Sequence, residues 1–165
     1  MIVTSSGIVD GKFLKKYGKH GEQFNKDGIP SCSIPVSILE SPERAVSYAL
    51  ILEDKDAIPV CGFSWIHWCA ANIKRTELLE NESVSAKDYV QGATSYSSKL
   101  QGLDRYQNSC YGGMTPPDAP HIYELHVFAL DCELELQHGF YMNELYRKMQ
   151  GHILDTATIA GIYDN

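Results

Sequence analysis

Five polar side chains lie on predicted strand faces, at the edge of the hydrophobic core that those faces should form. In SYALILEDKDA, an alternating apolar face ends in the carboxylates Asp54 and Asp56. In FSWIHWCAAN, His67 shares a face with aromatic side chains, and HIYELHVFAL opens with His121 and Tyr123 on one face. Side chains two positions apart in a strand point the same way, so each face mixes apolar and polar groups.

Convergence of the three faces would place Asp54, His67, His121 and Tyr123 around one small cavity. A carboxylate that accepts a hydrogen bond from one ring nitrogen fixes the tautomer of a histidine and favours its protonated form. The second ring nitrogen then becomes a donor that faces the cavity. Two such histidines and a tyrosine hydroxyl suit phosphate, sulfate or a carboxylate without any lysine.

The loop YGGMTPPDAP leads directly into the third of these strands. Pro116 and Pro117 restrict the backbone and would hold one wall of the cavity rigid. Gly112 and Gly113 carry no side chain, which allows backbone amides to approach a ligand. The loop therefore predicts a rigid wall beside His121.

Each of these residues also has an ordinary structural explanation. A lone histidine on an apolar strand face is more often a hydrogen-bonded core residue than a ligand. Asp54 and Asp56 fit turn carboxylates that cap the loop after a strand, and Tyr123 fits a core aromatic with its hydroxyl at the edge. Spacing alone leaves both interpretations open.

The elements that must position these side chains are mostly strands. The apolar patterns predict strands, and the polar segment 92–118 is long enough to favour a functional loop. Helical spacing and capping residues predict two short helices, one N-capped by Ser85 and one ended by Gly151. The predicted strands cover residues 33–39, 45–53, 62–73, 122–130 and 156–163, and the predicted helices cover 86–91 and 141–150.

Composition limits the class of protein. The 165 residues are 44% hydrophobic and 21% charged, which predicts a single domain over residues 1–165. The net charge of −7 and the absence of any basic run longer than two residues argue against general nucleic-acid or anionic-membrane binding. The five cysteines are odd in number and form no CxxC, so we expect free thiols. With no signal-peptide pattern and no apolar run of membrane length, we expect a cytoplasmic protein without an integral membrane segment.

Four motifs in order resemble the phosphatidylethanolamine-binding protein family. They are LEDKDAIP, WIHWCAANI, YGGMTPPDAPHIYELHVFALD and GHILDTATIAGIY, and they look most similar to the bacterial and archaeal, Raf kinase inhibitor-like branch. The resemblance covers nearly the whole chain and is weakest over the first thirty residues. It implies a mainly β fold, in which a large antiparallel sheet packs on a smaller sheet with a few short peripheral helices.

The same resemblance implies a pocket for phosphate or a phosphoryl head group. The ligand-binding residues that it assigns here are Asp54, Asp56, His67, Thr115, Pro117, His121 and Tyr123. The chain also departs from the family pattern. Lys55 and Ile58 replace two prolines of the D-P-D-A-P motif, Met114 and Thr115 replace a Pro-Cys or similar pair, and Ile122 replaces a common arginine.

The function expected from these observations is a small cytosolic binding protein with an anion pocket and a regulatory role through a bound partner. We expect no cofactor, and the resemblance is compatible with a homodimer. Two alternatives stay open. One is a metal-dependent enzyme that uses Asp54, His67 and His121 as ligands. The other is a pure protein-interaction module whose pocket holds a terminus or a phosphorylated side chain. Serine hydrolysis is disfavoured because no GxSxG occurs.

Overall fold

The longest apolar runs form the centre of a large β-sheet in a computed structural model that describes all residues 1–165. Strand β5 (Ser47–Asp54) lies between β6 (Trp65–Ile73) and β9 (His121–Leu130) and pairs antiparallel with both. Every residue of β5 is buried, because both faces of the strand are covered.

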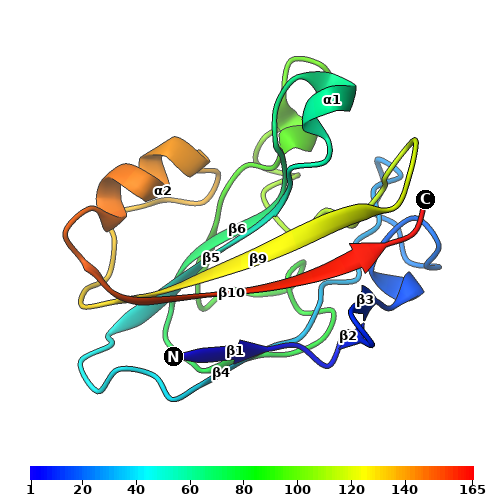
Figure 1. Cartoon of the computed structure of the whole chain (residues 1–165). Coiled ribbons are helices and arrows are strands. Elements are labelled where there is room, and N and C mark those ends of the chain that lie inside the picture. Colours follow the sequence, from blue (N-terminus) through cyan, green and yellow to red (C-terminus); the bar gives the residue numbers. More distant parts are fainter.

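The remaining strands extend this sheet and form a second, smaller one (Figure 1). The large sheet has seven strands in the order β2-β3-β10-β9-β5-β6-β8, and the small sheet has the order β1-β4-β7. All pairs are antiparallel except the short contact between β10 and β3. The bounds are β1 Ile2–Thr4, β2 Ile8–Val9, β3 Lys12–Phe13, β4 Val36–Leu39, β7 Glu77–Leu78, β8 Val90–Gln91 and β10 Ile153–Tyr163.

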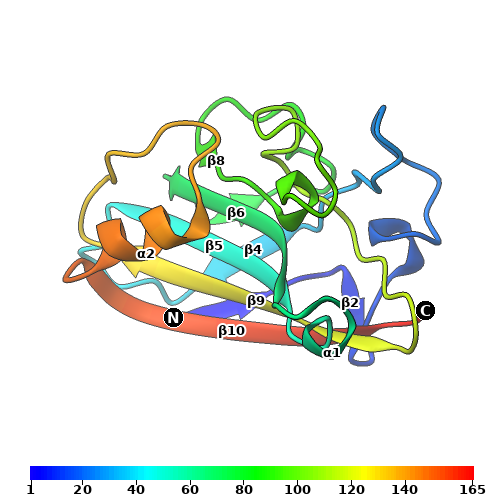
Figure 2. The ribbon, with the colours of Figure 1, turned by 90° about the horizontal axis from the view of Figure 1, so that it is seen from above.

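The large sheet has a separate apolar cluster on each face. The inner cluster fills the space between the two sheets and includes Leu50 and Leu125 from the large sheet and Ile38 from the small one. The outer cluster includes Ile51 and lies under helix α2 (Met142–Met149), which covers one end of the sheet (Figure 2). Burial of each such side chain contributes about 1.5–3 kcal/mol relative to exposure.

The helices are few, short and peripheral. In α2 the apolar side chains recur at helical spacing, the N–H of Tyr141 donates to the carboxylate of Glu144 at 2.7 Å, and Gly151 turns the chain at φ +84°. The helix predicted over 141–150 is therefore confirmed in shorter form. A single turn, α1 (Ile58–Cys61), follows β5 at the opposite end of the sheet from α2 (Figure 1). Two 3-10 turns, η1 (Lys15–Tyr17) and η2 (Ser95–Ser97), complete the set.

The helix predicted over 86–91 is wrong. Val90 and Gln91 form β8, which pairs with β6. The side chain of Gln91 is buried, where its oxygen accepts a hydrogen bond from the indole N–H of Trp68 at 2.8 Å. Ser85 donates its hydroxyl back to the carbonyl of Glu82 and caps no helix. Tertiary hydrogen bonds thus override the local helical pattern.

The expected fold class is otherwise confirmed: the chain is mainly β, with a large, almost entirely antiparallel sheet packed on a smaller one and few helices. The predicted strands near 45–53, 62–73, 122–130 and 156–163 correspond to β5, β6, β9 and β10, and only the end of 33–39 is a strand. No helix combines the length and the apolar character needed to cross a membrane.

Candidate functional site

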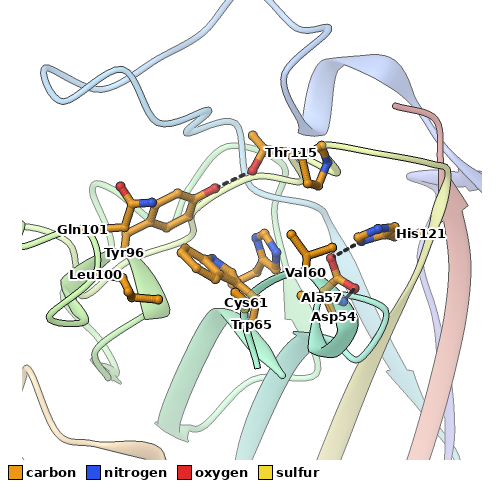
Figure 3. A pocket seen from close by; sticks show the side chains of 12 residues that line it. Asp54, Ala57, Val60, Cys61, Trp65, Tyr96, Leu100, Gln101, Thr115 and His121 are labelled. Carbon is orange, nitrogen blue, oxygen red and sulfur yellow. Dashed lines mark hydrogen bonds and ion pairs between the residues drawn. The ribbon is translucent and has the colours of Figure 1, made fainter. Parts of the chain in front are cut away.

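A cavity of about 460 Å³ opens where β5 ends and β9 begins (Figure 3). One side is formed by the ends of the central strands and by α1, and the other side by the long segment 92–118. The lining is half apolar and half polar. It consists of Asp54, Ala57, Val60, Cys61, Trp65, His67, Tyr96, Leu100, Gln101, Thr115, Pro117 and His121.

The order of the central strands brings the predicted polar residues together. Asp54 is the last residue of β5 and lies opposite Tyr123 of β9 and Trp65 of β6. His121 is the first residue of β9, and His67 is the third residue of β6. Because β9, β5 and β6 are neighbours in the sheet, Asp54, His67 and His121 reach the same cavity.

His121 is held between two carboxylates. Its Nδ1 lies 2.8 Å from Oδ2 of Asp54, and its Nε2 lies 3.0 Å from Oδ1 of Asp118. The other oxygen of Asp54 accepts the N–H of Ala57 at 3.1 Å, which fixes the carboxylate. Burial lowers the pKa of His121, but the bonds to Asp54 and Asp118 outweigh it and the pKa is raised overall. Because both carboxylates can only accept, this arrangement has a proton on each ring nitrogen, and the raised pKa favours that imidazolium form.

His67 has the opposite character. Its Nδ1 lies 2.7 Å from the carbonyl oxygen of Gly112, which can only accept, so Nδ1 carries the proton. Burial lowers the pKa of this ring, against the smaller effects of that carbonyl and of Asp54. The ring is neutral and its Nε2 is a lone-pair acceptor. The expectation that both histidines act as charged donors is wrong for His67, because burial disfavours its charged form and no carboxylate bonds to its ring to offset that effect.

Asp56 does not line the cavity. Its exposed carboxylate accepts the N–H of Ile122 at 2.8 Å, at the start of β9. The strand ends at Asp54, and the chain then turns into α1, so the two-residue alternation does not continue to Asp56. Asp56 therefore lies outside the cavity and caps the neighbouring strand, and its predicted contact with a ligand stays a prediction.

Tyr123 lies behind the cavity and is fully buried. Its ring packs edge-on against His67, with the ring centroids 5.2 Å apart, and tilted against His121 at 6.4 Å. Its hydroxyl has no hydrogen-bond partner within the chain. Tyr123 thus packs against both histidine rings and is not among the residues that line the cavity, and its direct contact with a ligand stays a prediction.

Thr115 and Pro117 line the wall opposite α1. The hydroxyl of Tyr96 donates to the carbonyl of Gly113 at 3.0 Å, so it accepts from the hydroxyl of Thr115 at 2.9 Å. Lys19 donates to the carbonyl of Pro116 at 2.6 Å from outside. The proline loop is therefore fixed from both sides, as its sequence predicts.

Comparison with known proteins identifies the family. A family model described as phosphatidylethanolamine-binding protein matches residues 4–164. The chain belongs to the phosphatidylethanolamine-binding protein family. YxkA of Bacillus subtilis is 48% identical over 149 residues, which are 87% of this chain and 89% of that protein. A putative phosphatidylethanolamine-binding protein homolog, CT736 of Chlamydia trachomatis, has a crystal structure with a TM-score of 0.80 at 30% identity, covering 99% of this chain and 96% of that chain.

A further solved structure supports the fold alone. YbcL of Escherichia coli, described as a member of the mammalian family of these proteins, gives a TM-score of 0.77 at 23% identity and covers 99% of this chain and 97% of that chain. Fold likeness at this identity does not carry a ligand or an activity from one chain to another.

The departures from the phosphatidylethanolamine-binding protein pattern lie mostly outside the cavity. Lys55 forms ion pairs with Glu124 at 2.5 Å and Glu53 at 3.5 Å and does not line the cavity. Ile122 is half exposed and also lies outside it. Met114 is fully buried, and its carbonyl accepts the N–H of Lys19. None of these three changes removes a polar group from the cavity.

The alternative of a metal centre at Asp54, His67 and His121 finds no support in the geometry. The structure contains two clusters in which three metal-ligating atoms lie within 4.8 Å of one another. Neither cluster contains Asp54, His67 or His121.

Sequence reasoning missed the apolar half of the cavity. Val60 and Leu100 come from α1 and from the segment 92–118, and neither stretch has a strand pattern that predicts which way a side chain points. The length of the segment did predict a functional loop, although no single residue could be chosen from it. Trp65 could have been predicted as a lining residue, because strand alternation places it on the same face as His67.

Proposed function

We propose that this protein binds a small ligand through a phosphoryl or carboxylate group, such as phosphate or phosphoethanolamine. The observation that carries the proposal is that Nε2 of His121 already binds an oxyanion, the carboxylate of Asp118, at 3.0 Å. The Asp118 side chain is 61% exposed, so it can turn into solvent and give its place to a ligand. Nδ1 of His121 stays bonded to Asp54, which keeps the ring charged.

The other polar atoms of the cavity restrict the ligand further. The indole N–H of Trp65 is buried and has no partner, whereas buried donors are normally paired. Nε2 of the neutral His67 is an acceptor, so it matches a ligand that also carries a donor, such as a P–OH or an ammonium group. With Asp118 turned into solvent, the charges of Asp54 and the protonated His121 cancel, so the cavity offers no net positive charge to balance a dianion. A singly charged or zwitterionic ligand therefore fits best.

The apolar half of the cavity suits a short aliphatic portion of the same ligand. Ala57, Val60 and Leu100 supply that surface, and about 460 Å³ accommodates a small molecule. Within this proposal the protein acts in the cytoplasm and binds without catalysis. Its regulatory role passes through a partner protein that presents an oxyanion to the same cavity.

A histidine-selective NMR titration with phosphoethanolamine tests the proposal. We expect the ring signals of His67 and His121 to shift in a saturable way, because both rings border the ligand. The exposed His138 provides a matched control: His138→Gln should leave the affinity unchanged, whereas His121→Gln should abolish it. The proposal fails if the signals do not move, or if His121→Gln binds as the natural protein does.

A further inference from the structure

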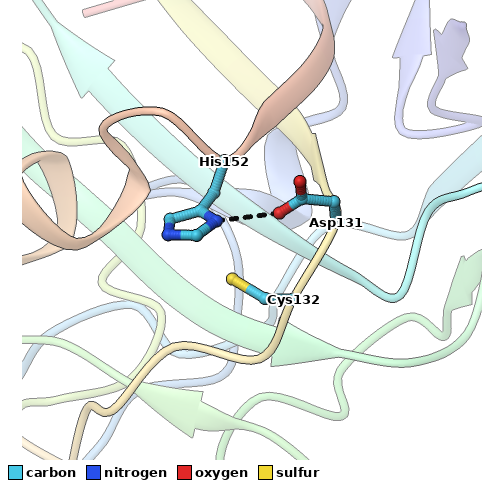
Figure 4. Close-up of side chains that lie close together, drawn as sticks. All are labelled: Asp131, Cys132 and His152. Atoms are coloured by element: carbon cyan, nitrogen blue, oxygen red, sulfur yellow. Dashed lines mark hydrogen bonds and ion pairs between the residues drawn. The ribbon is translucent and has the colours of Figure 1, made fainter.

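The end of β9 opposite the cavity carries three metal-ligating side chains that the proposed function does not use. Asp131 and Cys132 follow β9, and His152 precedes β10. Nδ1 of His152 lies 2.8 Å from Oδ1 of Asp131, and the sulfur of Cys132 points toward the same space (Figure 4). One ligand atom from each residue lies within 4.8 Å of the other two. We propose that Asp131, Cys132 and His152 bind a thiophilic divalent ion of the zinc class.

The backbone holds the three residues in place before any ion binds. Asp131 and Cys132 are neighbours in sequence and would point to opposite sides in a strand, but the chain bends there and brings both side chains to His152. The N–H of Asp131 donates to the carbonyl of His152 at 3.1 Å. The hydroxyl of the buried Ser47 donates to the carbonyl of Cys132 at 2.5 Å. The two ligand segments are thus tied to each other and to the core.

The turn before His152 is fixed as well. Gly151 adopts φ +84°, a conformation that side chains rarely allow, and this glycine directs the chain from α2 into β10. The N–H of His152 donates to the carbonyl of Met149 at 2.9 Å. Preorganised backbone positions of this kind reduce the entropy lost when side chains close on an ion.

The ligand set selects the class of ion. Thiolate and imidazole together favour zinc and its chemical relatives over calcium or magnesium, which prefer oxygen ligands. Tetrahedral zinc with bonds of about 2.0–2.3 Å places its ligand atoms about 3.3–3.6 Å apart. Nδ1 of His152 and Oδ1 of Asp131 are 2.8 Å apart, and all three ligand atoms lie within 4.8 Å of one another, so these limits bracket that range.

The charge balance also fits. Binding releases the thiol proton of Cys132 to solvent. The hydrogen bond between Asp131 and His152 breaks, the ring of His152 exchanges its Nδ1 proton through solvent for one on Nε2, and Nδ1 and the carboxylate then each bind the ion. The thiolate and the carboxylate then neutralise the two positive charges. The next carboxylate along the chain, Glu133, is paired with Lys74 at 2.8 Å and is not needed as a ligand. The fourth position is left to water.

The site is accessible and separate from the cavity. The side chains of His152 and Asp131 are 46% and 41% exposed, so an ion can enter from solvent. Strand β9 has ten residues, which places the two sites about 30 Å apart. Occupation of one site therefore leaves the side chains of the other site untouched.

A cobalt titration of the reduced, tag-free protein tests this site, because Co²⁺ replaces zinc and gives a near-ultraviolet charge-transfer band only when a thiolate binds it. We expect the band to saturate at one ion per chain and to disappear when Zn²⁺ is added. Cys132→Ser should abolish the band. Cys110→Ser changes a comparably half-buried free thiol and should keep it.

A second measurement uses zinc alone and needs no thiol signal. Zn²⁺ should raise the melting temperature of the natural protein through linkage, and His152→Gln should weaken the zinc affinity by at least about tenfold. The metal site is ruled out if no cobalt band forms, if the band survives Cys132→Ser or is lost in Cys110→Ser, or if His152→Gln binds zinc as tightly as the natural protein. The Asp131–His152 pair would then be an ordinary surface ion pair.

Discussion

His67 and His121 occupy two walls of one cavity, and their surroundings move their pKa values in opposite directions. Both residues are almost completely buried, with exposures of 2% and 3%. Nδ1 of His67 faces the carbonyl of Gly112, and its pKa is lowered by burial. Nδ1 of His121 faces the carboxylate of Asp54, and its pKa is raised despite burial. Desolvation dominates at His67, whereas the carboxylate partners of His121 outweigh it, so the two pKa values shift in opposite directions.

This difference gives the cavity a donor side and an acceptor side. The β9 wall offers the charged N–H of His121, and the β6 wall offers the lone pair of His67. A ligand with an oxyanion and a donor satisfies both walls at once.

Replacement of Asp54 should remove the contrast altogether. In Asp54→Asn, His121 loses its buried carboxylate partner, so its pKa should fall toward that of His67. Loss of one partner from a buried ion pair costs about 3–5 kcal/mol of unfolding free energy, and phosphoethanolamine affinity should fall by more than about tenfold. Urea unfolding and NMR titration measure the two effects. Asp56→Asn is the matched control, and an equal loss in that variant would contradict the assignment.

The two histidines should also shape the pH dependence of the unfolding free energy, one on the acid side of its maximum and the other on the alkaline side. The raised pKa of His121 stabilises the fold fully below pH 6.5, and this contribution is lost as the pH rises through the raised value. The lowered pKa of His67 stabilises the fold above pH 6.5, and this contribution is lost as the pH falls. Unfolding free energies between about pH 5 and 8 should therefore have a maximum. His67→Gln should reduce the loss of unfolding free energy on the acid side of the maximum and leave the alkaline side unchanged. An unchanged loss on the acid side would contradict the neutral state of His67.

Removal of the competing carboxylate should strengthen binding modestly. In Asp118→Asn the neutral side chain competes less well for Nε2 of His121. Exposed ion pairs are worth about 0.2–1 kcal/mol, so phosphate affinity should rise about two- to fivefold. Calorimetric titration with inorganic phosphate measures the change. Weaker binding in this variant would show that Asp118 assists the ligand and does not compete with it.

The smallest effect is expected from Lys55, which replaces a proline of the family motif. Its ion pairs with Glu53 and Glu124 lie outside the cavity, and its side chain is half exposed. Lys55→Ala should lower the unfolding free energy by no more than about 1 kcal/mol and leave ligand affinity unchanged. A clear change in affinity would show that this departure from the family pattern reaches the cavity.

Strand patterns predicted the central strands of the sheet, but local patterns failed over residues 86–91 and beyond the end of β5. The continuous apolar runs around Leu50 and Val127 required burial on a sheet, and they form β5 and β9. The local pattern over 86–91 favoured a helix, but the buried hydrogen bonds of Gln91 made that stretch a strand. Asp56 shows the same limit, because strand alternation carries no information beyond the residue at which the strand ends.

The family, the sheet-forming segments and the residue types around the cavity were all predictable from the amino-acid sequence, because apolar periodicity and motif order can be read along the chain. The folded chain was needed to show which carboxylates face His121, that His67 faces a carbonyl, and that Tyr123 packs against both histidine rings. The same is true of Asp131, Cys132 and His152, which belong to two strand ends. Contacts between distant segments set the local charge around each group, and that charge fixes what the group can bind.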